Sequence, residues 1–325
     1  MTALDLGRIG IGTMGLSPGV YGDVTDADAI DVIRRALDAG VRLVDTADAY
    51  GGGGENEKLV GKAISDRRDD AVLATKFGYV GPDQGRRVEI GYRMKLFVDG
   101  SPEHVAAAID ASLRRIGADH IDLWYLHFPD PEVPIEETVG AMAEQVTAGK
   151  VGHLGLSNVD ASQLRAAADV HPIAAVQGEY SLWSRDAERE LLPACRELGT
   201  RFVAWGPLGS GFLADSRFLA GDVPEVPRTD FRSRNPRFAP ENLSANADRF
   251  APLRTLAAGT GRSTAQLALA WLVARGVVSI PGTRDPNHLA ENLAAARLAL
   301  SEAELAEIDT LFPAGVAAGG VFKEA

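Results

Sequence analysis

Short apolar runs alternate with amphipathic helical stretches along the whole chain, and this alternation limits its possible folds more than any other feature. The apolar runs are rich in β-branched residues, as buried strands are, and eight of them can be recognised. They span residues 6–12, 41–46, 71–76, 121–127, 151–158, 174–180, 201–207 and 277–282. Strands that alternate with helices lie parallel and are joined by right-handed crossovers.

Eight strand–helix units close a (β/α)8 barrel, also called a TIM barrel, so the sequence predicts an α/β fold of this type. A doubly wound open sheet would give the same alternation and is the alternative. Three helix starts fit the pattern, because Ser101 and Asp285 each precede a proline and Ser301 forms a capping box with Glu304. No linker divides the 325 residues, 46% of them hydrophobic, so we expect one barrel domain over residues 1–325.

Two connections, residues 78–100 and 214–243, are longer than ordinary joints between a strand and a helix. Both follow strands. The segments after the strands of a barrel lie on its C-terminal face, where active sites are assembled. We therefore expect both connections to be long active-site or cofactor loops.

Composition narrows the possible partners. The formal net charge of -12 disfavours nucleic acid, which selects basic surfaces, and makes a small molecule the expected partner. Residues 1–8 lack a basic segment followed by an apolar one, and no apolar run reaches the roughly 18 residues of a membrane helix. We expect a cytoplasmic protein without a membrane or metal site.

The single cysteine, Cys195, lies on an apparent helix face, where we expect it to serve packing. The oligomeric state is not readable.

Residues 10–15, GIGTMG, match the G-x-G-x-x-G pattern after an apolar run. A dinucleotide-binding turn of the Rossmann type also needs a helix that begins at once and an acidic residue about 20 positions later. Here residues 17–19 (SPG) intervene, a helix is expected only near Thr25, and Asp45 comes too late. We interpret the stretch as a glycine-rich strand exit.

Polar or special residues follow most of the expected strands, at their carboxyl ends. In a barrel these residues converge on one mouth. They are Asp45, Tyr50, Lys76, His127, Ser157, Asn158, Gln177, Trp205, Gly206, Pro207, Thr283 and Arg284.

Four of these residues form a unit suited to delivering a proton to a carbonyl oxygen. Tyr50 is a phenol whose ordinary pKa is about 10, and we expect the adjacent ammonium of Lys76 to lower that pKa. Asp45 would keep Lys76 charged inside the cleft. His127, expected to be neutral beside that cation, would hydrogen-bond the substrate oxygen and polarise the carbonyl.

Seven ordered blocks resemble the aldo-keto reductases from residue 7 to about 312. They are DTADAY, LATKFG, LHFPDP, GLSN, the Gln177 strand, WGPLGSGFL, and IPGTR with HLAEN. The run at residues 230–238, DFRSRNPRF, is similar to that of the bacterial and plant branch. The resemblance implies a (β/α)8 barrel that reduces aldehydes or ketones with NADPH. It also implies that Asp45, Tyr50, Lys76 and His127 are the catalytic tetrad, with Tyr50 as the general acid.

The same resemblance implies where NADP binds. Ser157, Asn158 and Gln177 would bind the nicotinamide carboxamide, whose donor and acceptor suit amide side chains. Trp205 would stack on the ring, Leu208, Gly209 and Ser210 would contact the pyrophosphate, and Gly12 and Thr13 would lie near the nicotinamide ribose. The full implied set is Gly12, Thr13, Asp45, Ser157, Asn158, Gln177, Trp205, Gly206, Pro207, Leu208, Gly209, Ser210, Gly211, Gly282, Thr283, Arg284, His288, Glu291 and Asn292.

Three positions depart from the family pattern. Gly282 and His288 stand where many relatives have lysine and arginine, and Trp205 replaces a commoner tyrosine or phenylalanine. Arg284 precedes a helix N-terminus, which favours anions. We therefore expect Arg284, with help from His288 and Asn292, to bind the 2'-phosphate of NADPH and give a modest preference over NADH.

Two other function classes fit a barrel with polar strand ends. Some relatives are cofactor-binding regulatory subunits of potassium channels, and a barrel glycosidase would need a second carboxylate in the cleft. For a reductase, the expected substrate pocket contains Tyr50, Phe77, His127 and Phe128, with Tyr79, Phe97 and Trp183 as further apolar walls. These residues suggest aromatic or medium-sized aldehydes, and pyridoxal and sugar aldehydes stay open as substrates.

Overall fold

The computed structural model describes residues 4–82, 84–89, 95–214, 217–222 and 225–320. Its central element is an eight-stranded parallel sheet in the order β1-β2-β3-β6-β7-β8-β9-β10. The strands are β1 (Ile11–Gly12), β2 (Leu43–Asp45), β3 (Val72–Phe77), β6 (Ile121–Leu126), β7 (Val151–Ser157), β8 (Ile173–Glu179), β9 (Arg201–Trp205) and β10 (Val278–Ser279).

Contacts between the first and last strands close this sheet into a barrel. Ile9 forms a parallel bridge with Ser279, and the Gly10 N–H donates to the Ser279 carbonyl at 2.8 Å. The Ser279 N–H donates in turn to the Arg8 carbonyl at 3.2 Å. The predicted (β/α)8 barrel is therefore confirmed, and the open-sheet alternative is wrong.

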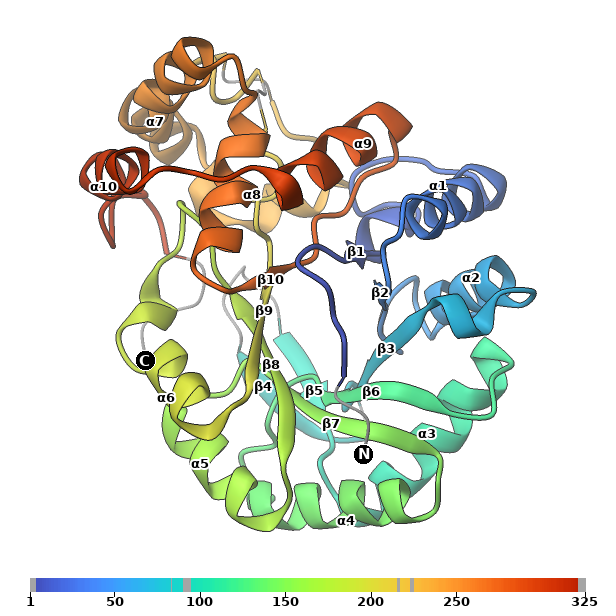
Figure 1. Cartoon of the computed structure of the whole chain (residues 1–325). Coiled ribbons are helices and arrows are strands. Elements are labelled where there is room, and N and C mark those ends of the chain that lie inside the picture. The colour runs from blue at the N-terminus through green and yellow to red at the C-terminus, as the bar shows by residue number, and fades with distance from the viewer. Residues whose placement is uncertain (1–3, 83, 90–94, 215–216, 223–224, 321–325) are drawn as a thin grey trace.

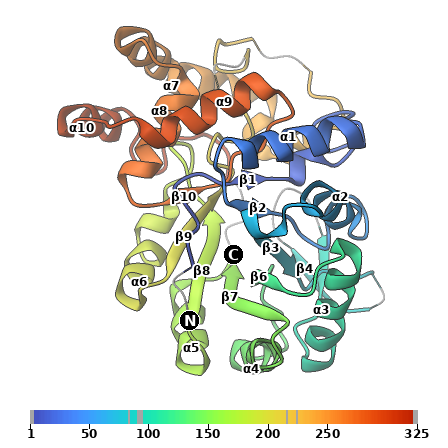
Figure 2. The ribbon, with the colours of Figure 1, turned by 45° about the vertical axis from the view of Figure 1, so that its right-hand side comes forward.

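Helices cover the outside of the barrel (Figures 1 and 2). Eight of them follow the eight strands in turn, and α7 and α10 are additions to the pattern. The helices are α1 (Asp26–Asp38), α2 (Glu55–Ile64), α3 (Pro102–Ile116), α4 (Ile135–Thr147), α5 (Ala161–Val170), α6 (Leu191–Leu198), α7 (Pro240–Thr260), α8 (Thr264–Ala274), α9 (Pro286–Ala294) and α10 (Glu302–Leu311).

The predicted helix starts agree with the observed caps. Ser101 caps α3, Asp285 caps α9, and Ser301 forms the expected capping box at α10. Thr25 caps α1, so no helix begins directly after residues 10–15, as the interpretation of that stretch required. Each side-chain oxygen accepts from a backbone N–H that would otherwise lack a partner in the first turn.

The two long connections contain more regular structure than expected. Residues 78–100 include an antiparallel hairpin of β4 (Arg86–Glu89) and β5 (Lys95–Val98). Residues 214–243 include two short 3-10 helices, Phe231–Arg234 and Pro236–Phe238, and the first turn of α7. Parts of both connections, residues 83, 90–94, 215–216 and 223–224, lie outside the described residues.

Two hydrophobic cores hold the barrel together. The larger lies between strands and helices and includes the buried Cys195, in agreement with its predicted packing role. The smaller lies inside the barrel and includes Leu6, Leu43, Leu123, Tyr125, Val203 and Ile280. Tyr125 on β6 and Gly155 on β7 are register partners, and a Cβ at Gly155 would overlap the Tyr125 ring. The missing side chain at Gly155 therefore makes room for the ring.

Helices α2 and α3 approach so closely that only glycine fits between them. A Cβ at Gly61 would overlap the carbonyl group of Ile116, which is backbone and cannot rotate away. Among the described residues, no helix has both the length and the apolar content needed to cross a membrane.

We predict that Gly61→Ala lowers the free energy of unfolding by about 2–4 kcal/mol, because the methyl group forces the two helices apart. The matched control is Gly140→Ala on α4, where an added Cβ meets no atom within 4 Å. That change should be neutral or stabilising by up to about 1 kcal/mol, through helix propensity alone. Urea unfolding of both variants measures the difference, and equal stabilities would refute the steric explanation.

Candidate active site

The polar residues predicted for the barrel mouth lie at the carboxyl ends of adjacent strands. Asp45 ends β2, Lys76 is the penultimate residue of β3, and His127 directly follows β6. Tyr50 belongs to the turn that begins at Asp48, three residues after β2. The parallel register therefore brings these four side chains into one cleft.

Lys76 and Asp45 form an ion pair that solvent does not reach. Their Nζ and Oδ1 atoms are 2.5 Å apart, and the side chains are 0% and 2% exposed. Lys76 also donates to the Thr46 carbonyl at 2.9 Å, while Asp45 Oδ2 accepts from Gln177 Nε2 at 2.7 Å. Burial lowers the pKa of Lys76, but Asp45 and Tyr50 outweigh that effect and raise it above the ordinary value. The ammonium therefore stays charged, as predicted.

Tyr50 lies within reach of that ammonium. Its hydroxyl is 3.3 Å from Lys76 Nζ, and its ring centroid is 5.0 Å from the same atom. Burial raises the pKa of Tyr50 above its ordinary value, and Lys76 only partly opposes the rise. The expectation of a lowered phenol pKa is thus wrong for the protein without cofactor or substrate, because the loss of hydration outweighs the cation.

His127 is a neutral imidazole. Burial, and then the charge of Lys76, hold the pKa of His127 well below its ordinary range, as predicted. The ring is edge-on to Tyr50, with centroids 5.9 Å apart, and edge-on to Tyr79 at 4.5 Å. Its Nδ1 atom is buried and has no hydrogen-bond partner among the described residues.

The amide side chains expected to read a carboxamide are already engaged. Asn158 donates from Nδ2 to the His127 carbonyl and to Ser157 Oγ, both at 3.0 Å. Its Oδ1 accepts from Trp205 Nε1 at 3.3 Å, a bond that tyrosine or phenylalanine at position 205 would lack. Asn158 adopts a left-handed backbone conformation with φ 55°, so this turn is locally strained. The structure therefore brings Ser157, Asn158 and Trp205 together.

The segment after β9 presents several backbone groups in left-handed conformation. Gly206, Gly209, Ser210 and Gly211 have φ values of 60°, 57°, 54° and 87°. The N–H groups of Gly209 and Gly211 donate to the carbonyls of Gly206 and Leu208, at 2.9 and 3.0 Å, so backbone hydrogen bonds close these turns. The Cβ position at Gly211 meets no atom within 4 Å, so the chain is open there.

Arg284 is exposed but has backbone partners. Its Nη1 donates to the Asp23 carbonyl and its Nη2 to the Tyr21 carbonyl, both at 2.8 Å. Tyr21 is hydrogen-bonded to Ser210 through its side chain. Arg284 thus joins the turn at residues 21–23 to the start of α9, a contact that the sequence did not predict.

The remaining expected cofactor residues lie in two settings. His288 is exposed, Glu291 is half-buried and Asn292 is buried within α9. Gly12 and Gly282 face each other, since a Cβ at Gly282 would lie 2.8 Å from the Gly12 carbonyl oxygen. Thr13 is fully buried, and its hydroxyl lies 2.8 Å from the Asp45 carbonyl and 2.6 Å from Asn56 Oδ1.

Sequence reasoning missed the polar residues that support the site. Asn56 is 2% exposed and accepts from Thr46 at 2.7 Å. Glu57 is fully buried and pairs with Arg115 Nε at 2.5 Å. Asp48, inside the same DTADAY block as Asp45, was passed over although a second acid three residues after a strand-end acid is a visible signal.

The predicted pocket walls are partly wrong. Phe77 is fully buried and stacks on Trp124, with ring centroids 4.2 Å apart, in the core under the helices. Trp183 is 3% exposed and packs on Phe212 in the same core. Phe77 points away from the cleft because a strand residue next to an inward-facing lysine points outward, and the sequence alternation was not applied there. Tyr79 and Phe128 do contact the His127 ring.

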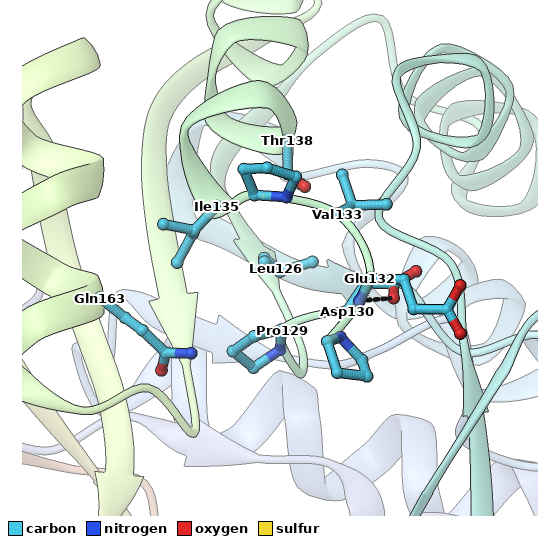
Figure 3. Close-up of a pocket in the computed structure, with 10 residues that line it drawn as sticks. Leu126, Pro129, Asp130, Glu132, Val133, Ile135, Thr138 and Gln163 are labelled. Atoms are coloured by element: carbon cyan, nitrogen blue, oxygen red, sulfur yellow. Dashed lines mark hydrogen bonds between the residues drawn. The ribbon is translucent and has the colours of Figure 1, made fainter.

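A cavity of about 330 Å³ lies under the segment that follows His127 (Figure 3). Its lining includes Leu126, Pro129, Ile135, Thr138 and Gln163. Asp130 holds the segment, accepting from the backbone N–H groups of Gly100 and Glu132 at 3.0 and 2.9 Å. The residues that line this cavity do not include Asp45, Tyr50, Lys76 or His127. The cavity is therefore separate from the cleft that holds those four side chains.

Comparisons with known proteins agree on one family. The Aldo/keto reductase family model matches residues 8–312. A protein named Probable aldo-keto reductase 1 from Glycine max is 42% identical over 323 residues, which covers 97% of this chain and 88% of that protein.

Solved structures show the same likeness. A glycerol dehydrogenase from Gluconobacter oxydans superposes with a TM-score of 0.79 at 28% identity, covering 96% of this chain and 93% of that one. An aldo/keto reductase from Klebsiella pneumoniae, solved in complex with NADP and acetate, gives 0.73 at 27% identity and covers 98% and 95%.

We predict that Lys76→Met lowers the free energy of unfolding by about 3–5 kcal/mol, because Asp45 loses its cation inside the barrel. Adding Asp45→Asn should recover at least about 1 kcal/mol, since the buried charge is then removed as well. The control is Lys58→Met, which breaks an exposed pair with Glu55 and should cost less than about 1 kcal/mol. Urea unfolding at pH 7 measures all four proteins, and a double variant no more stable than Lys76→Met would contradict the coupling.

Proposed function

This chain belongs to the Aldo/keto reductase family, and from that premise we propose that it reduces aldehydes or ketones to alcohols with NADPH. In the proposed reaction, the carbonyl carbon receives a hydride and the carbonyl oxygen receives the proton of the Tyr50 hydroxyl. The observation that best supports this assignment is the 3.3 Å contact between Tyr50 and the buried, charged Lys76.

Lys76 serves the proton transfer through its charge. When Tyr50 gives up its proton, the resulting phenolate faces the ammonium, which lowers the free energy of that state. The field is available without rearrangement because Asp45 and the Thr46 carbonyl already hold the ammonium in place. The ammonium thus favours loss of the Tyr50 proton during the reaction, although burial raises the pKa of Tyr50 above its ordinary value.

His127 is suited to orient the carbonyl group. A neutral imidazole can donate one hydrogen bond to the substrate oxygen without competing with Tyr50 as an acid. Tyr79 and Phe128 flank the ring, with centroids 4.5 and 5.4 Å away. These aromatic neighbours favour a carbonyl compound with an apolar or aromatic substituent, and they exclude water from the oxygen.

The donor set of the mouth fits a nicotinamide dinucleotide phosphate. Asn158 Oδ1 has two acceptor sites, of which Trp205 uses one, so this oxygen can still accept from a carboxamide N–H. Ser157 contributes a hydroxyl, and the indole of Trp205 suits a flat ring. The segment at residues 206–211, which contains three glycines in left-handed conformation, lets the backbone approach a pyrophosphate closely. Bound NADPH would supply the hydride. A related Klebsiella pneumoniae reductase has been solved with NADPH.

We predict that Tyr50→Phe lowers kcat for carbonyl reduction by at least about a hundredfold, the usual scale for a lost general acid. NADPH affinity should stay within about twofold, because the phenol is assigned to the substrate side. Tyr79→Phe is the matched control, since that ring also contacts His127, and it should lose less than about tenfold. Steady-state rates and cofactor fluorescence titration test both, and wild-type turnover in Tyr50→Phe would exclude it as the proton donor.

A second prediction concerns cofactor choice. Arg284→Ala should raise KM for NADPH by about tenfold or more, with little change for NADH, if its guanidinium binds the 2'-phosphate. The two carbonyl partners of Arg284 offer the alternative that it only holds the turn at residues 21–23. Kinetics with both cofactors at fixed low salt separate the two roles: equal losses for NADPH and NADH would assign Arg284 to the turn.

A further inference from the structure

A cluster of three acids and two cations lies behind the reactive phenol. The acids are Asp45, Asp48 and Glu57, and the cations are Lys76 and Arg115. Asp45 and Lys76 end β2 and β3, whereas Glu57 and Arg115 come from α2 and α3. Asp45, Glu57 and Lys76 are buried, whereas Asp48 and Arg115 are partly exposed. Full ionisation would still leave one negative charge of this cluster without a partner, and this is costly beside buried groups.

Hydrogen bonds show which acid is the least suited to ionise. Asp45 accepts from Lys76 and from Gln177. Glu57 accepts from Arg115 at 2.5 Å and from Thr75 at 2.7 Å. Donors of this kind favour the carboxylate form of an acid, and each of these two acids also faces a cation.

Asp48 is different. Its Oδ1 is buried and has no hydrogen-bond partner among the described residues. The backbone N–H of Ala49 donates to its carboxyl group. Its own backbone N–H donates to the Lys76 carbonyl at 3.0 Å, which fixes Asp48 against β3 and in the same turn as Tyr50.

We propose that Asp48 holds the surplus proton of this cluster at neutral pH and thereby sets the charge against which Tyr50 donates its own proton. Asp48 is a positioning residue, since it acts on Tyr50 through its charge and does not touch the substrate. The part of the proposal that concerns catalysis rests on the proposed function.

Electrostatics agree with the geometry. Burial, and then the charge of Glu57, raise the pKa of Asp48 to about 8, against the opposing effects of Arg115, Ala49 and Lys76. Asp48 in turn contributes to raising the pKa of Tyr50 and of Tyr79.

The other titrating groups of the cleft change charge elsewhere on the pH scale. The pKa values of Lys76, Tyr50 and Tyr79 are raised above their ordinary alkaline values, and that of His127 lies well below its ordinary value. The pKa of Asp45 is also raised by burial, against the effects of Lys76 and Gln177. Asp48, whose pKa is raised to about 8, is the acid that we expect to ionise between pH 7 and 9.

The sign of the effect follows from charge repulsion. A carboxylate at Asp48 disfavours the phenolate that forms when Tyr50 gives up its proton, so reduction slows as Asp48 ionises. Because Tyr50 develops only part of a full negative charge in the transition state, we expect kcat/KM to fall by about threefold to tenfold as Asp48 ionises. We expect this fall between pH 7 and 9 in the wild-type protein.

Asp48→Asn keeps the shape of the side chain and removes its proton equilibrium. Its kcat/KM for carbonyl reduction should change by less than about twofold between pH 7 and 9. The matched control is Glu55→Gln, an exposed acid of the neighbouring first turn of α2, whose profile should equal that of the wild type. Asp48→Ala tests the same point if the amide disturbs the turn.

A second titrating acid must be distinguished from Asp48. Burial raises the pKa of Glu179 to about 7, and this residue pairs with Arg237 at 3.1 Å at the end of β8. A Glu179→Gln variant that keeps the fall between pH 7 and 9 supports Asp48. A fall that disappears in Glu179→Gln and persists in Asp48→Asn overturns the proposal.

Stability gives a readout that needs neither substrate nor cofactor. The unfolded carboxyl titrates near pH 3.9 and the folded one near pH 8, so between these values the folded protein binds more protons than the unfolded chain. Wild-type stability therefore falls as pH rises through this window, and that of Asp48→Asn lacks this contribution. From pH 5.5 to 8.5 the Tm difference should shift in favour of Asp48→Asn by at least about 3 °C.

The two measurements separate the possible failures. If the wild type reduces no carbonyl compound with NADPH, the proposed function fails, while the Tm comparison still tests the proton on Asp48. Parallel Tm curves for wild type and Asp48→Asn would overturn the proposal whatever the activity. A Tm shift without a change in the pH profile would overturn the link to Tyr50.

Discussion

The buried ion pair between Lys76 and Asp45 is the interaction on which the rest of the site depends. Removing two charges from water costs several kcal/mol per ion, and only a close, fully hydrogen-bonded geometry offsets that cost. Here the geometry comes from three strands, because Gln177 of β8 completes the bonds to Asp45 and the Thr46 carbonyl completes those to Lys76. The pair therefore forms only when distant parts of the chain are assembled, and the closed barrel is what holds it.

The buried ammonium of Lys76 influences the protonation states of the side chains around it. His127 is held neutral, and Tyr50 faces a cation that favours its phenolate although burial favours the phenol. The surrounding acids then decide how much of that positive field reaches the substrate. Glu57 pairs with Arg115, whereas Asp48 Oδ1 has no hydrogen-bond partner among the described residues. The rate of proton donation thus depends on residues behind the phenol as well as on those that touch the substrate.

Sequence reasoning predicted the barrel because strand and helix periodicity are local properties. The same reasoning located Asp45, Lys76 and His127, since polar residues at strand ends must meet in a parallel barrel. It could not predict the sign of the Tyr50 pKa shift, which depends on how completely the surrounding chain excludes water. Contacts of Arg284 and Asn56 were also out of reach where they join distant segments, since Arg284 and Asp23 are 261 residues apart and Asn56 and Thr13 are 43 apart. Phe77 was misplaced for a simpler reason, since alternation along β3 turns it away from Lys76.

The pairing of Tyr125 with Gly155 inside the barrel restricts how relatives of this protein can diverge. A side chain at position 155 is incompatible with the large ring at 125, yet it becomes acceptable once 125 is small. The same substitution is thus harmful or harmless depending on which of the two positions changes first, which is sign epistasis between neighbouring strands. We therefore expect a small residue to replace Tyr125 before a larger residue replaces Gly155, so that these two substitutions in the barrel interior have a preferred order.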